Sequence, residues 1–141
     1  MKKLTKLNQL KQDKKGFTLI EIVIVLVIIA ILSAMLVPSM MGWIDDSKKK
    51  SFLQEARSAL TATQAEIANM YVAGETNIPT SFAAGSSYLD GVSKKVGRTV
   101  AANEISWTLD GDEIDTFTYT DTGEKYTVTW DGDKWGEVTQ K

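Results

Sequence analysis

Hydrophobic residues follow three different patterns along this chain, and each pattern predicts a different element. The first pattern is a run of 20 residues, 22–41, that is interrupted only by Ser33, Pro38 and Ser39. As an α-helix this run would span about 30 Å, which is the hydrocarbon thickness of a bilayer. The run is apolar on all sides, as expected for a helix surrounded by lipid or by other helices.

The second pattern is an apolar stripe at helical spacing, which continues the same helix beyond the apolar run. The predicted stripe consists of Leu53, Ala56, Leu60, Ile67 and Met70 or Tyr71. Gly74 is a suitable C-cap and Pro79 follows soon after, so we expect the helix to end near Gly74. A straight helix over residues 17–73 would be about 85 Å long. A soluble domain of this size does not require such a helix.

The third pattern is period-two alternation of threonine and aromatic residues near the C-terminus. It predicts strands at residues 105–109, 117–120, 125–130 and 135–138, separated by Asp-Gly or Thr-Gly turns. We expect an antiparallel meander of these strands, packed on the apolar stripe of the helix. Its predicted inner face consists of Ile105, Trp107, Leu109, Phe117, Tyr119, Tyr126, Val128 and Trp130.

These patterns together predict an α+β fold. A long N-terminal hydrophobic helix continues into an amphipathic half that packs on a small antiparallel sheet. Pro38 lacks a backbone N–H and its ring clashes with the carbonyl of Ala34, so we expect a kink or local unwinding there. The expected N-terminal divisions are a basic leader at residues 1–16, the apolar helix at 17–44 and its amphipathic half at 45–73. A variable loop is expected at residues 74–103, with a short helix near 88–96, and the sheet at residues 104–141.

The composition excludes several kinds of chemistry. The chain has no cysteine and no histidine. It therefore has no disulfide, no Ser-His or Cys-His nucleophile pair and none of the usual zinc ligands. A carboxylate-only mechanism such as glycoside cleavage remains formally open, but we expect no enzymatic activity and no cofactor.

The charge is distributed unevenly. Residues 1–16 hold six of the 16 basic residues and one of the 18 acidic residues, so the rest of the chain would carry −7. Residues 104–141 alone hold 10 acidic residues and three lysines. An acidic outer domain argues against tight binding of a nucleic-acid backbone and favours solubility. The lysines before the apolar run predict a cytoplasmic N-terminus and an external C-terminal domain.

The junction between the leader and the apolar run carries a specific motif. Its residues are Lys14-Lys15-Gly16-Phe17-Thr18-Leu19-Ile20-Glu21. A glycine after basic residues, a glutamate four residues after Phe17 and a proline inside the apolar run coincide here. This combination resembles the prepilin signature of type IV pilins and the related pseudopilins. The resemblance is close over residues 14–71 and only general beyond them.

The resemblance implies a processing step and a set of partners. A prepilin peptidase would cut between Gly16 and Phe17, and the new amine of Phe17 would be N-methylated. Glycine before the cut lets the backbone lie extended and close to an enzyme. The helix would then become the core of a helical filament of identical subunits. Further partners would be the bilayer before assembly, a membrane platform and an assembly ATPase.

The resemblance also gives roles to Glu21 and Pro38. Glu21 would pair with the Phe17 ammonium of a neighbouring subunit and set the axial register. The alternative is an interfacial carboxylate with no partner, since an acid at the edge of a bilayer is less costly than one at its centre. Similar pilins often carry a glycine eight residues before the proline and melt between the two. Ala30 occupies that position here, which leaves the extent of melting open.

We expect a structural subunit of a type IV pilus-like filament on the cell surface, acting in adhesion, surface motility or display. One alternative is a pseudopilin of a type II secretion or DNA-uptake system. A second is a single-span membrane protein with an extracellular ligand-binding β domain. A secretory signal peptide fits less well, because the run is long and no small-x-small cleavage site follows it.

Two Asp-Gly-Asp sequences offer weak candidates for calcium ligands. They are Asp110 to Asp112 and Asp131 to Asp133. Neither has the spaced acids and distant glutamate of an EF-hand loop. Asp-Gly is first of all a hairpin-turn signal, so we expect turns here and no metal site.

Overall fold

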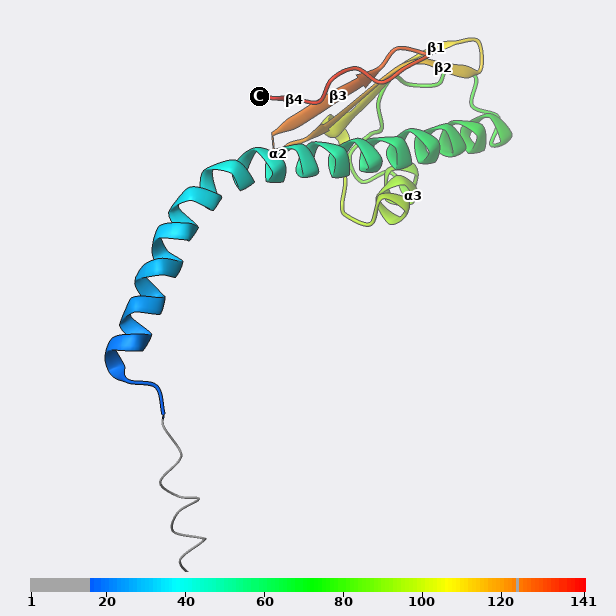
Figure 1. Cartoon of the computed structure of the whole chain (residues 1–141). Coiled ribbons are helices and arrows are strands. Elements are labelled where there is room, and N and C mark those ends of the chain that lie inside the picture. Colours follow the sequence, from blue (N-terminus) through cyan, green and yellow to red (C-terminus); the bar gives the residue numbers. More distant parts are fainter. Residues whose placement is uncertain (1–15, 124) are drawn as a thin grey trace, which may run out of the picture. The chain divides into compact units, whose positions relative to one another are not determined.

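The computed structural model describes residues 16–123 and 125–141 and divides the chain into two compact units, Met1–Ile44 and Asp45–Lys141. The predicted leader, apart from Gly16, lies outside the described residues. Helix α2, Leu19–Val72, contributes its first part to one unit and its remainder to the other (Figure 1). The order along the chain is then α3 (Ser87–Val96), a short 3₁₀ turn (Ala102–Glu104), β1 (Ile105–Asp110), β2 (Glu113–Asp121), β3 (Tyr126–Trp130) and β4 (Thr139–Gln140).

Helix α2 passes Pro38 without a break. The helical assignment is continuous over all 54 residues, so the local unwinding considered at this proline does not occur in this structure. The Ser33 hydroxyl donates to the carbonyl of Ile29 at 2.7 Å, and the Ser39 hydroxyl donates to that of Leu36 at 2.9 Å. The hydroxyls thus bond within their own turns, as serines in apolar helices commonly do. The kink remains a prediction.

The end of α2 is a Schellman motif. Gly74 has φ +86°, its N–H donates to the carbonyl of Tyr71 at 3.0 Å, and the N–H of Glu75 donates to that of Met70 at 3.1 Å. These two bonds satisfy carbonyls that the last turn leaves unpaired, and glycine adopts this left-handed conformation without steric cost. The predicted helix end near Gly74 is therefore confirmed.

The four strands form one antiparallel sheet in the order β1-β2-β3-β4, which confirms the predicted meander. Figure 1 shows the sheet along one side of α2 and α3 on the other side of that helix. Strand β2 is longer than predicted, because the tight turn after Asp110 lets pairing resume at Glu113. Six of the eight predicted inner-face residues are buried, whereas Leu109 and Trp130 are half-buried.

The predicted fourth strand was misplaced. Residues 135–138 make only an isolated bridge between Trp130 and Trp135, and β4 is the later pair Thr139–Gln140. The reason is a close approach of backbones at Gly136, whose N–H donates to the carbonyl of Thr129 at 2.8 Å. A Cβ at Gly136 would meet that oxygen at 3.3 Å. Glycine inside a strand pattern often marks such an irregularity.

The helix face that packs in the core overlaps the predicted stripe only in part. Ala56, Ile67 and Met70 are buried as predicted, Leu53 and Leu60 are half-buried, and Tyr71 is exposed. The remaining buried positions are Phe52, Ala59, Ala62 and Thr63. Phe52 stacks on Tyr119 with ring centroids 5.4 Å apart. Fully buried alanines indicate a close approach of α2 to the rest of the core.

This close packing predicts the effect of a larger side chain. Ala59→Leu should lower the free energy of unfolding of the second unit by about 1–3 kcal/mol, because extra methylenes force a packed core apart. The measurement is urea unfolding of the full chain in detergent micelles, followed by tryptophan fluorescence. Thr61→Leu, at an exposed position of the same helix, is the matched control and should change little. Equal effects of the two variants would contradict the described packing.

Candidate functional site

The predicted processing segment is exposed at the start of the described chain. Among the described residues, no atom other than those of Gly16 and its chain neighbours lies within 4 Å of a Cβ built on Gly16. The Phe17 side chain is 85% exposed. Helix α2 begins two residues later, at Leu19, so both residues of the predicted cleavage bond precede the helix.

Glu21 closes a capping box with Thr18. The Thr18 N–H donates to Oε2 of Glu21 at 2.7 Å, and the Glu21 N–H donates to Oγ1 of Thr18 at 3.3 Å. These reciprocal bonds satisfy two backbone donors that would otherwise remain unpaired at the helix start. A carboxylate in the first turn also interacts favourably with the helix dipole. Sequence reasoning missed this role, although Thr-x-x-Glu before an apolar run is its signature.

The capping box leaves part of the carboxylate available. Only Oε2 of Glu21 accepts a hydrogen bond within the part of the chain that the structure describes. A carboxylate can accept bonds at both oxygens. Capping of its own helix and pairing with a second chain's ammonium are therefore compatible roles for Glu21.

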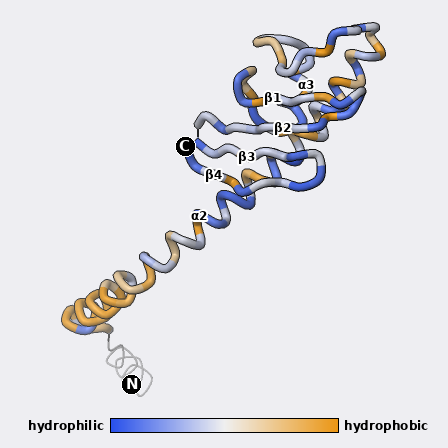
Figure 2. Tube along the Cα trace, turned by 90° about the horizontal axis from the view of Figure 1, so that it is seen from above, coloured by the Kyte–Doolittle hydropathy of each residue, from blue (hydrophilic) through white to orange (hydrophobic). Residues whose placement is uncertain are grey.

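The apolar part of α2 has no protein cover. Its large hydrophobic residues are exposed, from Leu19 to Ile44, and Figure 2 shows them concentrated at this end of the helix. An 18-residue window has a mean hydropathy of 3.1 with none of it buried, so α2 is long and apolar enough to cross a membrane. Soluble monomers rarely expose an apolar patch of this size. This exposure fits a helix that is covered by lipid or by other helices.

A second polar cluster joins three elements of the other unit through Arg98, which follows α3. The guanidinium donates to Oε1 of Glu55 at 2.7 Å, to Oε2 of Glu104 at 2.9 Å and to the hydroxyl of Tyr119 at 2.8 Å. The Tyr119 hydroxyl also donates to Glu55. Burial disfavours the charged form of Arg98, but the bonds to both glutamates outweigh it and raise its pKa.

Glu104 is the most buried charged member of this cluster, with 3% of the residue exposed. Besides Arg98, it accepts bonds from the N–H of Ala101 at 3.0 Å and from the N–H and hydroxyl of Thr122 at 2.9 and 2.7 Å. Burial raises the pKa of this carboxyl, and these hydrogen bonds overcome it, so the pKa lies below its ordinary value. Every member has partners, which favours a structural role over a catalytic one. The sequence showed no signal for this cluster.

The weak calcium candidates form turns. Gly111 and Gly132 both have positive φ, at 68° and 90°. Oδ1 of Asp131 accepts from the N–H groups of Asp133 and Lys134 at 3.2 and 2.9 Å. Among the described residues, no group of three or more carboxylates is placed to hold a metal ion. The interpretation of Asp-Gly as a turn signal is confirmed.

Comparisons with known proteins place the N-terminal segment in context. The family described as the prokaryotic N-terminal methylation motif matches residues 11–37. The type II secretion system core protein G of Dickeya chrysanthemi is 34% identical over 71 residues, which cover 50% of this chain and 43% of that protein. The proteins of the same name from Klebsiella pneumoniae and Aeromonas hydrophila are 36% identical over 69 and 70 residues.

The extent of these matches is limited. The chain spans 43% to 46% of the length of these curated relatives. No solved structure matches the chain significantly. Within these limits, the match to residues 11–37 shows that the chain carries the prepilin-type methylation motif. Together with the curated relatives, it confirms the predicted resemblance to the pilin and pseudopilin superfamily.

The buried cluster predicts a dependence of stability on pH. The folded-state pKa of Glu104 lies below the ordinary 4.5. Its contribution is therefore fully present above the ordinary value and is lost as the pH falls through the lowered pKa. Glu104→Gln should cost about 1–3 kcal/mol at pH 7 and should weaken the loss of stability between pH 5 and 3. Thermal unfolding at several pH values measures this, with the exposed Glu113→Gln as control. A variant as stable as the parent at pH 7 would contradict it.

Proposed function

We propose that this chain is a pilin-like fibre subunit, made as a membrane prepilin and cleaved between Gly16 and Phe17. The observation that supports it most is the methylation motif at the start of an uncovered apolar helix. The motif implies a prepilin peptidase and N-methylation of Phe17. The helix would anchor the subunit in the cytoplasmic membrane before assembly and would pack against its copies afterwards.

Within this class we propose a pseudopilin of a type II secretion-type system. The sequence alone favoured a pilus for adhesion, motility or display. The curated relatives are all named as core protein G of type II secretion systems, and they favour the alternative. The match covers only about half of this chain, so a surface pilus is the second candidate.

The mechanism of assembly follows from the properties of α2. In the membrane, lipid covers the apolar half, and in the fibre other copies cover it. The free amine of Phe17, created by cleavage, supplies a cation close to the Glu21 carboxylate. Charges interact more strongly at the membrane edge than in water. Pairing between chains favours one axial offset over others, which apolar contacts alone do not.

The first test of this proposal is processing. We expect the mature chain in cells to begin with N-methyl-Phe17 and Gly16→Leu to block maturation. Intact-mass measurement should show loss of residues 1–16 and gain of one methyl group. The conservative control is Gly16→Ala, which should mature at least partly. Assembled material that still begins at Met1 would overturn the proposal.

The second test separates the two roles of Glu21. Glu21→Gln keeps a capping-box side chain but removes the charge, whereas Glu21→Val removes both. If the charge sets the register, both variants should be processed normally and both should lose most of their fibre yield. The measurement is the yield of sheared fibre relative to the processed subunit in the membrane. Normal yield from Glu21→Gln with loss in Glu21→Val would reduce the role of Glu21 to capping.

A further inference from the structure

The second unit has three consecutive lysines, preceded by Asp45 and Asp46, near one end and a group of carboxylates near the other. The lysines Lys48 to Lys50 lie near the start of this unit, where the hydroxyl of Tyr126 donates to Asp45 at 3.2 Å. The β1–β2 turn lies at the other end, where the hydroxyl of Tyr71 donates to the carbonyl of Gly111 at 3.3 Å. Lys49 and Tyr71 are about 33 Å apart along α2. The two ends therefore cannot neutralise each other within one chain.

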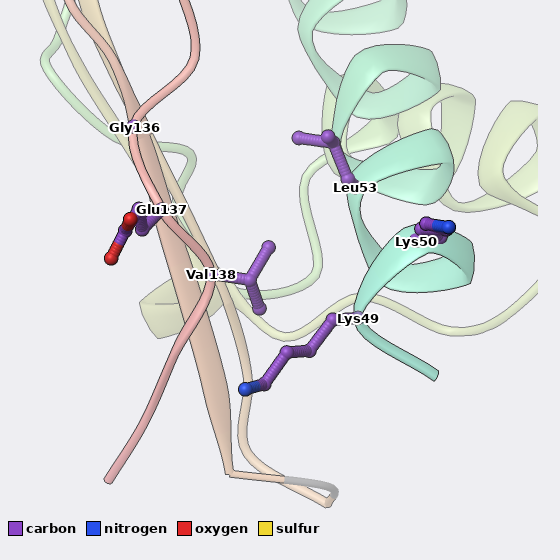
Figure 3. A pocket seen from close by; sticks show the side chains of 6 residues that line it. All are labelled: Lys49, Lys50, Leu53, Gly136, Glu137 and Val138. Carbon is purple, nitrogen blue, oxygen red and sulfur yellow. The ribbon is translucent and has the colours of Figure 1, made fainter. Parts of the chain in front are cut away.

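The lysine end contains a groove between α2 and the C-terminal segment. It has a volume of about 380 Å³ and is lined by Lys49, Lys50, Leu53, Gly136, Glu137 and Val138. Figure 3 shows the side chains of Leu53 and Val138 pointing toward each other, with Lys49 at the rim and Glu137 pointing away. Lys49 pairs with Asp45 at 3.1 Å. Lys50 is exposed and has no acidic partner within residues 16–123 and 125–141.

The acidic end is a narrow, exposed turn. Asp110, Asp112 and Glu113 are exposed, and the structure shows no ion pair for them among the residues it describes. Gly111 sits at the tip with φ 68° and adds no side chain there. The β3–β4 turn, with Asp131 and Asp133, lies beside it, since a Cβ on Gly132 would be 3.0 Å from the carbonyl oxygen of Asp115.

We propose that the lysine groove of one chain receives the acidic β1–β2 turn of a second copy of this chain. This inference rests on the proposed function, in which copies stack in parallel along α2. In such a stack the lysine end of one copy faces the acidic end of the next. The contact joins two different surfaces of the same chain. An interface of that kind continues from copy to copy and builds an open fibre instead of a closed dimer.

The groove and the turn carry opposite charges. Lys49 lies at the rim although it is paired with Asp45, and Lys50 lies beside the groove on α2 with its side chain directed away from the C-terminal segment (Figure 3). Leu53 and Val138 supply an apolar floor, and the turn brings three carboxylates. Anionic lipid headgroups are the competing occupants of the lysines, since only Asp45, Asp46 and Ser47 separate Lys48 to Lys50 from the apolar segment. If the acidic turn of a second copy occupies the groove, crosslinks should form between copies at these two surfaces. If lipid headgroups occupy it, no such crosslinks are expected.

The test uses the absence of cysteine from the natural chain. Full-length chains carrying both Lys50→Cys and Asp112→Cys are assembled and then mildly oxidised. The two cysteines of one chain are too far apart for a disulfide, which needs Cα atoms within about 7 Å. A ladder of covalent oligomers on a non-reducing gel is therefore the expected result. Lys50→Cys combined with Asp90→Cys, an exposed position on α3, should give no ladder.

A charge exchange provides the second measurement. Lys50→Glu and Asp112→Lys should each lower fibre yield several-fold, and the two together should restore most of it. If the parent forms fibres but the cysteine pair gives no ladder and the exchange does not rescue, this inference is wrong and the proposed function stands. If the processed parent forms no fibre at all, the proposed function and this inference both fail.

Discussion

The uncovered apolar surface of α2 is the constraint on which the rest of the molecule depends. Its hydrophobic residues from Leu19 to Ile44 are exposed, which fits a cover of lipid or of other helices. Lipid tails are as apolar as these side chains, so moving from lipid to a bundle of copies gains little hydrophobic free energy. The apolar surface therefore disfavours exposure of this helix to water, but it hardly distinguishes between lipid and a bundle of other copies. The polar groups at its borders must supply direction and register.

At the N-terminal end of the apolar segment, the Glu21 carboxylate caps the helix with one oxygen and leaves the other available to a partner. Oε2 of Glu21 accepts the Thr18 N–H, which fixes the side chain against its own helix start. A group held in this way loses less side-chain entropy when it binds a second cation. The capping box therefore prepares Glu21 for pairing. In the proposed fibre, helix formation and assembly would depend on the same residue, which is why the charge and the cap must be separated by substitution.

Much of the fold was predictable from the sequence, because the alternation of Trp107, Phe117 and Tyr119 follows directly from strand geometry. The stripe on α2 was correct at Ala56, Ile67 and Met70 but missed Ala59 and Ala62, because alanines carry little hydrophobic signal although close packing requires their small size. The cluster around Arg98 was not predictable. Its partners Glu55 and Tyr119 are 43 and 21 residues away, and no local pattern states which distant polar groups will meet. The capping box was readable and was overlooked.

In the proposed fibre, the negatively charged subunits must also be placed so that their repulsion does not prevent packing. Without residues 1–16 the chain carries −7, and identical subunits of that charge repel one another as a whole. Physiological salt screens exposed charges beyond about 8 Å, however, so the net charge matters less than which surfaces approach. Among the residues that the structure describes, the carboxylates of the β1–β2 turn and the Lys50 ammonium form no ion pair, and they lie toward opposite ends of α2's second half. In the proposed fibre, parallel stacking would bring unlike ends together, whereas an antiparallel or side-by-side arrangement would bring like charges together, so these charges would favour one polarity of assembly.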